Sequence, residues 1–415
     1  MHVTIRAALA LLLALSGRCW AEGSTRMGCE TMTRMAAGAQ GTLMTGMALQ
    51  HEGERGSLGD TSFRVSGWKE DAGSMALRSA HARASLRLRG GAGEDEDEVQ
   101  RLIENGCSLW DDEKDASGAE RCFLKAIELS PKNEEALSSY GVLLHESSNN
   151  FQEATKYFEM ALSSNPSHID SLHFYGNMMH AMHEDLKAKM LYERAIQEAE
   201  RMIANGEEPH ILYVETLCNY GALLEKALGE VDAAEMAYKK ALEVNPEDTS
   251  VLFNYGVLLE DRKDDVDGAQ TMYLRALEID PEDLNVLMNM ALLLQNHRHD
   301  YHAAEKYFTK AMEVNPDRVD LLSNFAVFLE DIRHDTNRAT ELYLKALTIC
   351  PEDVVTLAHY GGFLLRNGKA EEAEQRFKQE RACLPQNAME IDPEVAKPII
   401  ELRRSLVGES LMQQM

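Results

Sequence analysis

Residues 251–281 read VLFNYGVLLEDRKDDVDGAQTMYLRALEIDP, and this stretch decides the fold. Its apolar and small residues form a first stripe at Leu252, Tyr255, Gly256 and Leu259, and a second at Ala269, Tyr273, Ala276 and Leu277. Spacings of three and four are the period of a helix with one buried face. The charged residues 260–267 separate the stripes, and Pro281 ends the second helix because the residue before proline avoids the helical conformation. The stretch therefore predicts a helix-turn-helix hairpin.

The hairpin recurs along the chain with a period of 35 residues. The small residue within the first helix is found at Gly106, Gly141, Gly176, Gly221, Gly256, Ala291, Ala326 and Gly361. Only the step from Gly176 to Gly221 differs, at 45 residues. A fixed period of this length indicates stacked supersecondary units. The small residue leaves room for a second helix to cross closely.

The second helix carries its own recurrent pattern of alanine, an aromatic residue, alanine and proline. It reads Ala119, Phe123, Ala126, Pro131 near the start, then Ala154, Phe158, Ala161, Pro166, and later Ala304, Phe308, Ala311, Pro316. This pattern resembles the tetratricopeptide repeat family, in eight tandem units over residues 93–388. The resemblance implies an all-α, right-handed solenoid whose concave groove binds proteins. The turn is one residue longer than in the family's usual unit of about 34 residues.

The two ends of the chain differ from the repeats. Residues 1–21 combine Arg6, an apolar run and a small-residue exit at Ala21, which predicts a secretory signal peptide and no membrane span in the mature protein. Residues 22–92 have no sustained period, so we expect a disordered leader. Together they resemble the two-part leaders of complex plastids in some algae; plain secretion or a cytoplasmic protein with an unused leader are the alternatives. Apolar residues beyond Pro393 predict a capping helix in residues 389–415.

Charge and motifs narrow the function classes. Residues 1–90 carry eleven basic and seven acidic residues, whereas the whole chain has a net charge of −27, so the remainder carries −31. An acidic body repels phosphate backbones, which argues against direct nucleic-acid binding. Phosphate-binding loops, nucleophile elbows and zinc-protease motifs do not occur in the sequence, so no enzyme, cofactor or metal is predicted. His173 and His180 share one helical face, which leaves a metal or pH-sensing site as an alternative.

The first helices carry a second recurrence on the face opposite the apolar stripe. It consists of Asn219, Asn254, Asn289 and Asn324, spaced 35 residues apart. Each amide offers a donor and an acceptor, which is what an extended peptide backbone uses. The row resembles the asparagine ladder in the repeat arm of O-linked N-acetylglucosamine transferases, and this implies that peptides are held by their backbone. The alternative is that these asparagines serve packing or turn contacts.

Acidic residues next to this row set the expected polarity of the groove. We expect Glu225, Glu260, Asp261, Glu330 and Asp331 near its rim. Basic residues are scarce there, so the groove is predicted to prefer neutral or basic segments over acidic ones.

The predicted function is a non-catalytic scaffold that binds extended segments or partner proteins. The alternatives are a structural subunit of a larger assembly, similar to the RNA-processing proteins built from half-tetratricopeptide repeats, or a substrate adaptor for a glycosyltransferase. The extra ten residues between Gly176 and Gly221, in residues 193–212, are expected to lengthen the second helix of one unit and the first helix of the next. Partner identity and oligomeric state are not specified by the sequence.

Overall fold

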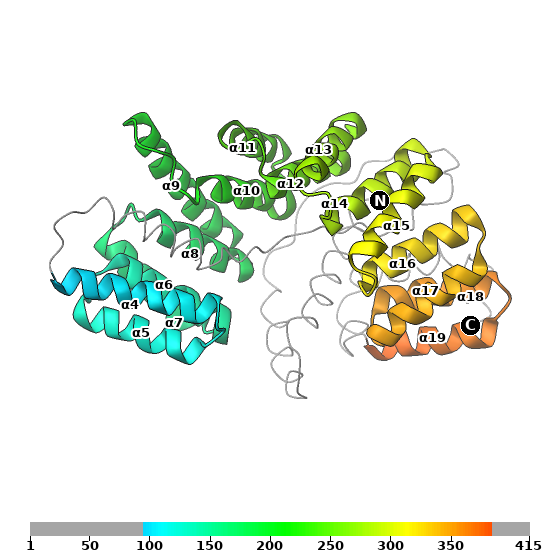
Figure 1. Cartoon of the computed structure of the whole chain (residues 1–415), viewed down its shortest axis with the longest axis horizontal. Helices are drawn as coiled ribbons and strands as arrows, with labels where there is room; N and C mark the ends of the chain where they lie inside the picture. Colours follow the sequence, from blue (N-terminus) through cyan, green and yellow to red (C-terminus); the bar gives the residue numbers. More distant parts are fainter. Residues whose placement is uncertain (1–93, 384–415) are drawn as a thin grey trace, which may run out of the picture. The chain divides into compact units, whose positions relative to one another are not determined.

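The computed structural model describes residues 94–383, which form sixteen α-helices in eight consecutive hairpins (Figure 1). The predicted all-α repeat fold is confirmed. The expected signal peptide (1–21), leader (22–92) and capping helix (389–415) lie outside the described residues. Secretion and plastid delivery therefore stay predictions. Within residues 94–383, no helix is both long and apolar enough to cross a membrane.

The described chain divides at residues 286 and 287 into two compact parts. The first contains α4 (Glu94–Asp111), α5 (Ala116–Leu129), α6 (Glu134–Ser148), α7 (Phe151–Ser164), α8 (Ile169–Ala181), α9 (Asp185–Ala204), α10 (Tyr213–Leu223), α11 (Val231–Val244), α12 (Thr249–Arg262) and α13 (Val266–Ile279). The second contains most of α14 (Leu284–Leu293), then α15 (Tyr301–Val314), α16 (Val319–Phe328), α17 (Thr336–Ile349), α18 (Val354–Arg366) and α19 (Ala370–Cys383). Single π-helical turns follow α10, α14 and α16, at η2 (Leu224–Leu228), η3 (Leu294–Arg298) and η4 (Leu329–Arg333).

Short polar side chains fix where many helices begin. Asp265 accepts a hydrogen bond from the Gly268 amide at 2.9 Å, and Asn133 accepts one from the Ala136 amide at 2.8 Å. Each such N-cap contributes roughly 1 kcal/mol to helix stability. At the other end, the residues before the recurrent prolines are the C-caps of four second helices: Asn245, Asp280, Asn315 and Cys350. The predicted helix ends are confirmed there.

Each hairpin has a small core in which an aromatic ring of the second helix covers the small residue of the first. A Cβ atom added to Gly256 would lie 2.5 Å from Cε1 of Tyr273. Tyr273 is fully buried, as are Ala269 and Ala276 beside it. The steric reason given for the recurrent glycine is therefore confirmed.

The residue that lengthens the repeat lies at the end of the first helix. In six hairpins the amide that opens the second helix bonds to a carbonyl six residues earlier, as from Asp265 to Leu259 at 2.9 Å. In the other two it bonds five residues earlier, as from Glu184 to Met179 at 2.9 Å. The wider turn takes up the extra residue, and in three hairpins it is a full π-helical turn.

Every one of these turns contains a residue with left-handed backbone. These residues are Lys114, Asn149, His183, Gly229, Asp264, His299, His334 and Gly368, with φ between 50° and 76°. Glycine adopts this conformation without strain, whereas a residue with a Cβ atom is strained there by about 1–2 kcal/mol. His183, with a φ of 60°, lies in one of the two narrower turns. The other narrower turn has Gly368 at this position.

We expect His183→Gly to stabilise the protein by about 0.5 kcal/mol. The relief of about 1–2 kcal/mol of strain exceeds the greater chain entropy of glycine, which costs about 0.5–1 kcal/mol. The His183 side chain is exposed, so little packing is lost. Urea unfolding followed by circular dichroism measures the change. His183→Ala keeps the Cβ atom and is the control; a glycine variant no more stable than the alanine variant would contradict the prediction.

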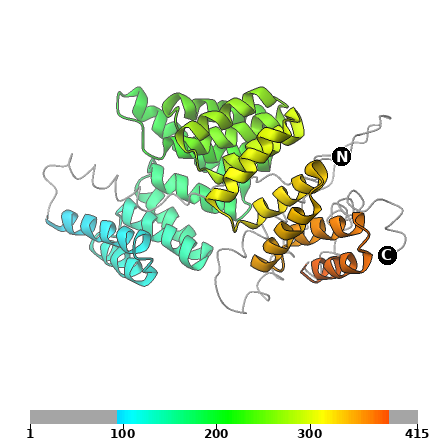
Figure 2. The same ribbon diagram turned by 45° about the vertical axis from the view of Figure 1, so that its right-hand side comes forward.

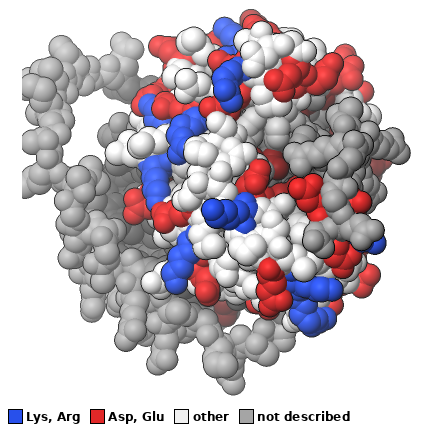
Figure 3. Space-filling model, turned by 90° about the vertical axis from the view of Figure 1, so that its left-hand side faces the viewer, with Lys and Arg blue, Asp and Glu red and all other residues white. Residues whose placement is uncertain are grey.

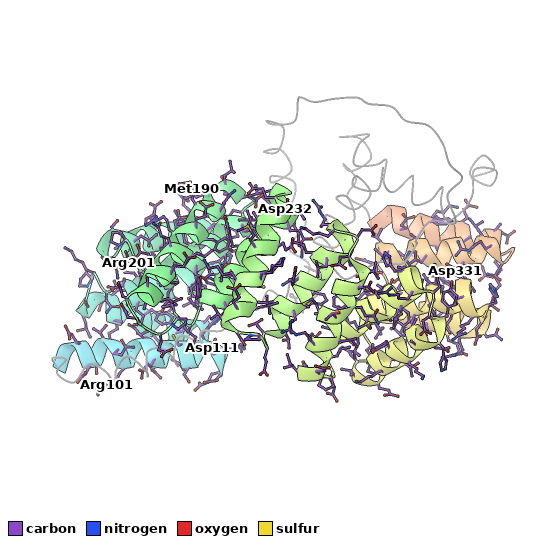
Figure 4. All side chains as sticks on the ribbon, turned by 90° about the horizontal axis from the view of Figure 1, so that it is seen from above. Arg101, Asp111, Met190, Arg201, Asp232 and Asp331 are labelled. Atoms are coloured by element: carbon purple, nitrogen blue, oxygen red, sulfur yellow. The ribbon has the colours of Figure 1, made fainter. Side chains whose placement is uncertain are left out.

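Within the first compact part, the first helices contact one another in order: α4 with α6, α6 with α8, α8 with α10, and α10 with α12. The second helices instead contact the first helix of the next hairpin, as α11 does with α12. The first helices therefore form the inner row of this part, and the second helices form its outer row. Figure 2 shows these helices, coloured from cyan to green, after a turn of 45°. Met190 on α9 and Asp232 on α11, labelled in Figure 4, are exposed residues of the outer row.

The extra ten residues lengthen one helix rather than two. α9 has 20 residues, against 14 in α13. The expected lengthening of the following first helix is wrong, because α10 begins at Tyr213, eight residues before Gly221, while α12 begins seven residues before Gly256. Gly206, with a φ of 82°, and Pro209 lie between α9 and α10 and interrupt the helix there.

Candidate functional site

The four asparagines of the predicted ladder occupy the same place on α10, α12, α14 and α16. Asn219 and Asn254 are half-buried in the first compact part. Asn289 and Asn324 are only 1% and 2% exposed. The first pair therefore offers the more accessible amides.

The amide nitrogens of three ladder asparagines approach polar or sulfur atoms on the first helix of the preceding hairpin. Asn219 Nδ2 donates to Asn177 Oδ1 at 3.2 Å, and Asn254 Nδ2 donates to Cys218 Sγ at 3.4 Å. Asn324 Nδ2 lies 3.9 Å from Met288 Sδ. Sulfur is a weak acceptor, so two of these three bonds contribute little. The Oδ1 atoms of Asn219 and Asn254 accept no hydrogen bond from residues 94–383, which leaves two acceptors for another molecule.

Asn177 extends the row across the 45-residue step. Its Oδ1 accepts hydrogen bonds from Tyr192 at 2.6 Å and from Asn219. Sequence analysis missed it, because the ladder position one hairpin before Asn219 is Phe174. Asn177 lies three residues further on and so shares a helix face with Phe174. An asparagine three residues after the ladder position was therefore the sequence signal that could have identified Asn177.

His173 and His180, singled out in the sequence, both make hydrogen bonds to other side chains. His173 is buried, with Nδ1 2.8 Å from Thr216 Oγ1 and Nε2 3.1 Å from Asn177 Nδ2. His180 Nδ1 lies 2.7 Å from Asp185 Oδ1. No group of three or more metal-ligating side chains suited to an ion is found within the described part of the chain.

Three of the acidic residues predicted at the rim are buried. Glu225, Glu260 and Glu330 are 4%, 3% and 8% exposed, and for them the prediction of a rim position is wrong. Asp261 is half-buried and Asp331 is exposed. The glutamates lie in the last turn of the first helix, where they face the aromatic residue of their own second helix.

Two of these glutamates each accept a hydrogen bond from the tyrosine of their own hairpin. Tyr273 donates to Glu260 Oε2 at 3.1 Å, and Tyr343 donates to Glu330 Oε2 at 3.4 Å. Each tyrosine follows its glutamate by thirteen residues. In the hairpin whose aromatic residue is Phe308, without a hydroxyl, the equivalent glutamate is replaced by Gln295. The pairing of glutamate with tyrosine was thus visible in the sequence but was not used.

Glu330 also has a basic partner. Arg366 from the next hairpin donates to Glu330 Oε1 through Nε at 2.7 Å and Nη2 at 2.6 Å. Burial raises the pKa of Glu330, and Arg366 opposes this shift. This buried carboxylate therefore receives hydrogen bonds on both oxygens.

Glu225 is in the same place but lacks such partners. Among the residues that the structure describes, neither its Oε2 atom nor the buried hydroxyl of Tyr238 has a hydrogen-bond partner. Burial raises the pKa of Glu225 to about 7; Lys226 and Arg262 oppose the shift, and Asp261 adds to it. A buried carboxylate without a partner is costly to ionise.

Charges are mixed on the described part of the face that Figure 3 shows. Figure 3 shows acidic and basic side chains interspersed around an uncharged area on the face that it presents. The negative charge of the repeats is therefore not concentrated on that face.

Comparison with known proteins agrees with the fold. Residues 221–283 match the tetratricopeptide repeat family, and the eight helical hairpins show the tetratricopeptide repeat fold over residues 94–383. Proteins of this kind are typically non-catalytic scaffolds that bind other proteins. No curated protein matches the chain in sequence.

Solved structures share the fold at low sequence identity. Yeast Tom70 is 17% identical, with a TM-score of 0.50, and the similarity covers 84% of this chain and 79% of that one. A chain of the APC/C hetero-tetramer Cut9–Hcn1 is 12% identical, with a TM-score of 0.51, over 71% of this chain and 52% of that one. These similarities concern the fold alone. The likeness of the asparagine row to that of the glycosyltransferase arm stays a prediction.

Proposed function

We propose that this protein is a non-catalytic scaffold that binds an extended, neutral or basic protein segment along the row of first helices in its first compact part. The observation that carries the proposal is the pair of half-buried asparagines, Asn219 and Asn254, whose Oδ1 atoms accept no hydrogen bond from residues 94–383. Carbonyl oxygens at repeated positions suit the repeated amides of a peptide backbone.

The dimensions of the two partners agree. Packed helices lie roughly 8–10 Å apart, and an extended chain rises about 3.3 Å per residue. About three residues of a bound segment would therefore span one hairpin. The charge of −31 carried by residues 91–415 favours segments without excess negative charge.

Replacing both Asn219 and Asn254 by alanine is expected to weaken binding of an extended peptide about 30-fold. Each lost hydrogen bond is worth about 1 kcal/mol, and 1.4 kcal/mol is a factor of ten in affinity. The probe is a peptide of about twelve residues, selected from a display library on the purified protein and measured by fluorescence anisotropy.

Asn205→Ala is the matched control for this test, because Asn205 is an exposed amide at the end of α9. Unchanged affinity in the double variant would contradict backbone capture by these amides. Loss of helicity instead of affinity would favour the alternative in which the asparagines only join hairpins.

A structural subunit of a larger assembly is the second candidate. The observation that favours it is an exposed apolar strip at the start of α9, where Leu186 is 71% and Met190 63% exposed. Exposed apolar residues of this kind are typical of surfaces that meet other proteins.

A further inference from the structure

We propose that Glu225 and Tyr238 form a receptor for an arginine side chain of the bound segment. This inference rests on the proposed peptide-binding function and names one anchor within it. The evidence is an equivalent position elsewhere in the chain, where an arginine of the protein itself already occupies the place.

The occupied position consists of Glu330, Tyr343 and Arg366. One guanidinium contacts one oxygen of the buried carboxylate through two nitrogens, at 2.7 and 2.6 Å, and the tyrosine hydroxyl binds the other oxygen at 3.4 Å. The Arg366 side chain is 38% exposed and that of Glu330 only 8%. An arginine that approaches from the surface can therefore reach this buried carboxylate.

Three repeats earlier the same positions hold a different set. Glu225 and Tyr238 are equivalent to Glu330 and Tyr343. The position equivalent to Arg366, however, is occupied by Asp261. The chain thus supplies a second acid in place of the guanidinium. Glu225 Oε2 and the Tyr238 hydroxyl, both buried, have no hydrogen-bond partner in the described residues.

The nearby basic residues do not substitute for the missing arginine. Lys226 and Arg262 lie close enough to influence the charge of Glu225, yet neither forms an ion pair with it within residues 94–383. A buried carboxylate without a partner costs folding free energy, which a cation from another molecule would recover. Arginine fits better than lysine, because its planar fork places two donors on one carboxylate, as Arg366 does.

The test compares three versions of the selected peptide with the full-length protein. The three versions carry arginine, lysine or the neutral isostere citrulline at the same position. The comparison is repeated at each position along the peptide. We expect one position at which arginine binds about tenfold more tightly than citrulline, in line with hydrogen bonds to charged groups. In Glu225→Gln this ratio should fall below about twofold. In Asp261→Arg it should fall likewise, because the new side chain fills the receptor.

Glu247→Gln is the control, since it removes the same charge from an exposed side chain in the turn before α12. The tenfold ratio should persist in it. Equal binding of arginine and citrulline by the wild type, or a ratio unchanged by Glu225→Gln, would overturn the inference and leave the scaffold function intact. Absence of binding by any peptide would overturn both. Circular dichroism confirms that each variant is folded.

Discussion

Glu225→Gln is expected to stabilise the folded protein by about 3 kcal/mol at pH 8 and to have little effect near pH 4.5. Burial raises the pKa of Glu225 from 4.5 to about 7, and each unit corresponds to about 1.36 kcal/mol. Glutamine occupies nearly the same volume and has no charge to bury. The variant is therefore more stable wherever the wild type must ionise this group.

The direction of the pH dependence follows from proton binding. Below the unfolded pKa of 4.5 the carboxyl is protonated in both states and contributes nothing. Between 4.5 and 7 the folded protein holds a proton that the unfolded chain has lost, so this group makes stability fall as pH rises. Above 7 the loss is complete. Urea unfolding of both proteins across this range measures the difference.

Glu247→Gln is again the control, because its side chain is exposed and its neutralisation should produce no comparable change between pH 4.5 and 8. A Glu225→Gln variant whose stability ran parallel to that of the wild type over this range would contradict the prediction. The same variant is expected to lose the preference for arginine. A gain in stability with a loss of recognition is the usual behaviour of a residue retained for binding.

Gly256→Ala is expected to destabilise the protein by up to about 2 kcal/mol. The added Cβ atom would lie 2.5 Å from Cε1 of Tyr273, so the ring or the helix must move. Tyr273 is fully buried and its hydroxyl is held by Glu260, which restricts that movement. Overpacking costs about 1–3 kcal/mol, whereas alanine gains only about 1 kcal/mol over glycine within a helix.

Gly141→Ala provides the comparison, because its Cβ atom would lie 3.2 Å from the ring of Phe158 and needs only a small adjustment. We expect its effect to be smaller by about 1 kcal/mol. Urea unfolding gives the two values, and hydrogen exchange in α12 and α13 locates the change. Combining Gly256→Ala with Tyr273→Leu should cost less than the sum of the two.

An equal effect of both glycine substitutions would contradict this reasoning. Ala291 and Ala326 occupy the corresponding position in two other hairpins. If Gly256→Ala left stability unchanged, the two helices of this hairpin would be able to move apart to the spacing found in the hairpins that have alanine at this position.

The sequence by itself determined the hairpins of this protein. Helix period, small residues and prolines act within a few residues of one another, so Gly256, Tyr273 and Pro281 were sufficient to predict one unit, and the 35-residue recurrence to predict the rest. The asparagine row could also be read from the sequence, since equivalent residues of a repeat lie on equivalent faces.

Only the tertiary structure decided which polar groups have partners. Arg366 reaches Glu330 across 36 residues, and Asn177 replaces Phe174 in the asparagine row at the 45-residue step. The burial of Glu225, Glu260 and Glu330 depends on how closely the second helix crosses the last turn of the first. Such contacts follow from the angle and distance at which hairpins stack, and no spacing within a single helix specifies these.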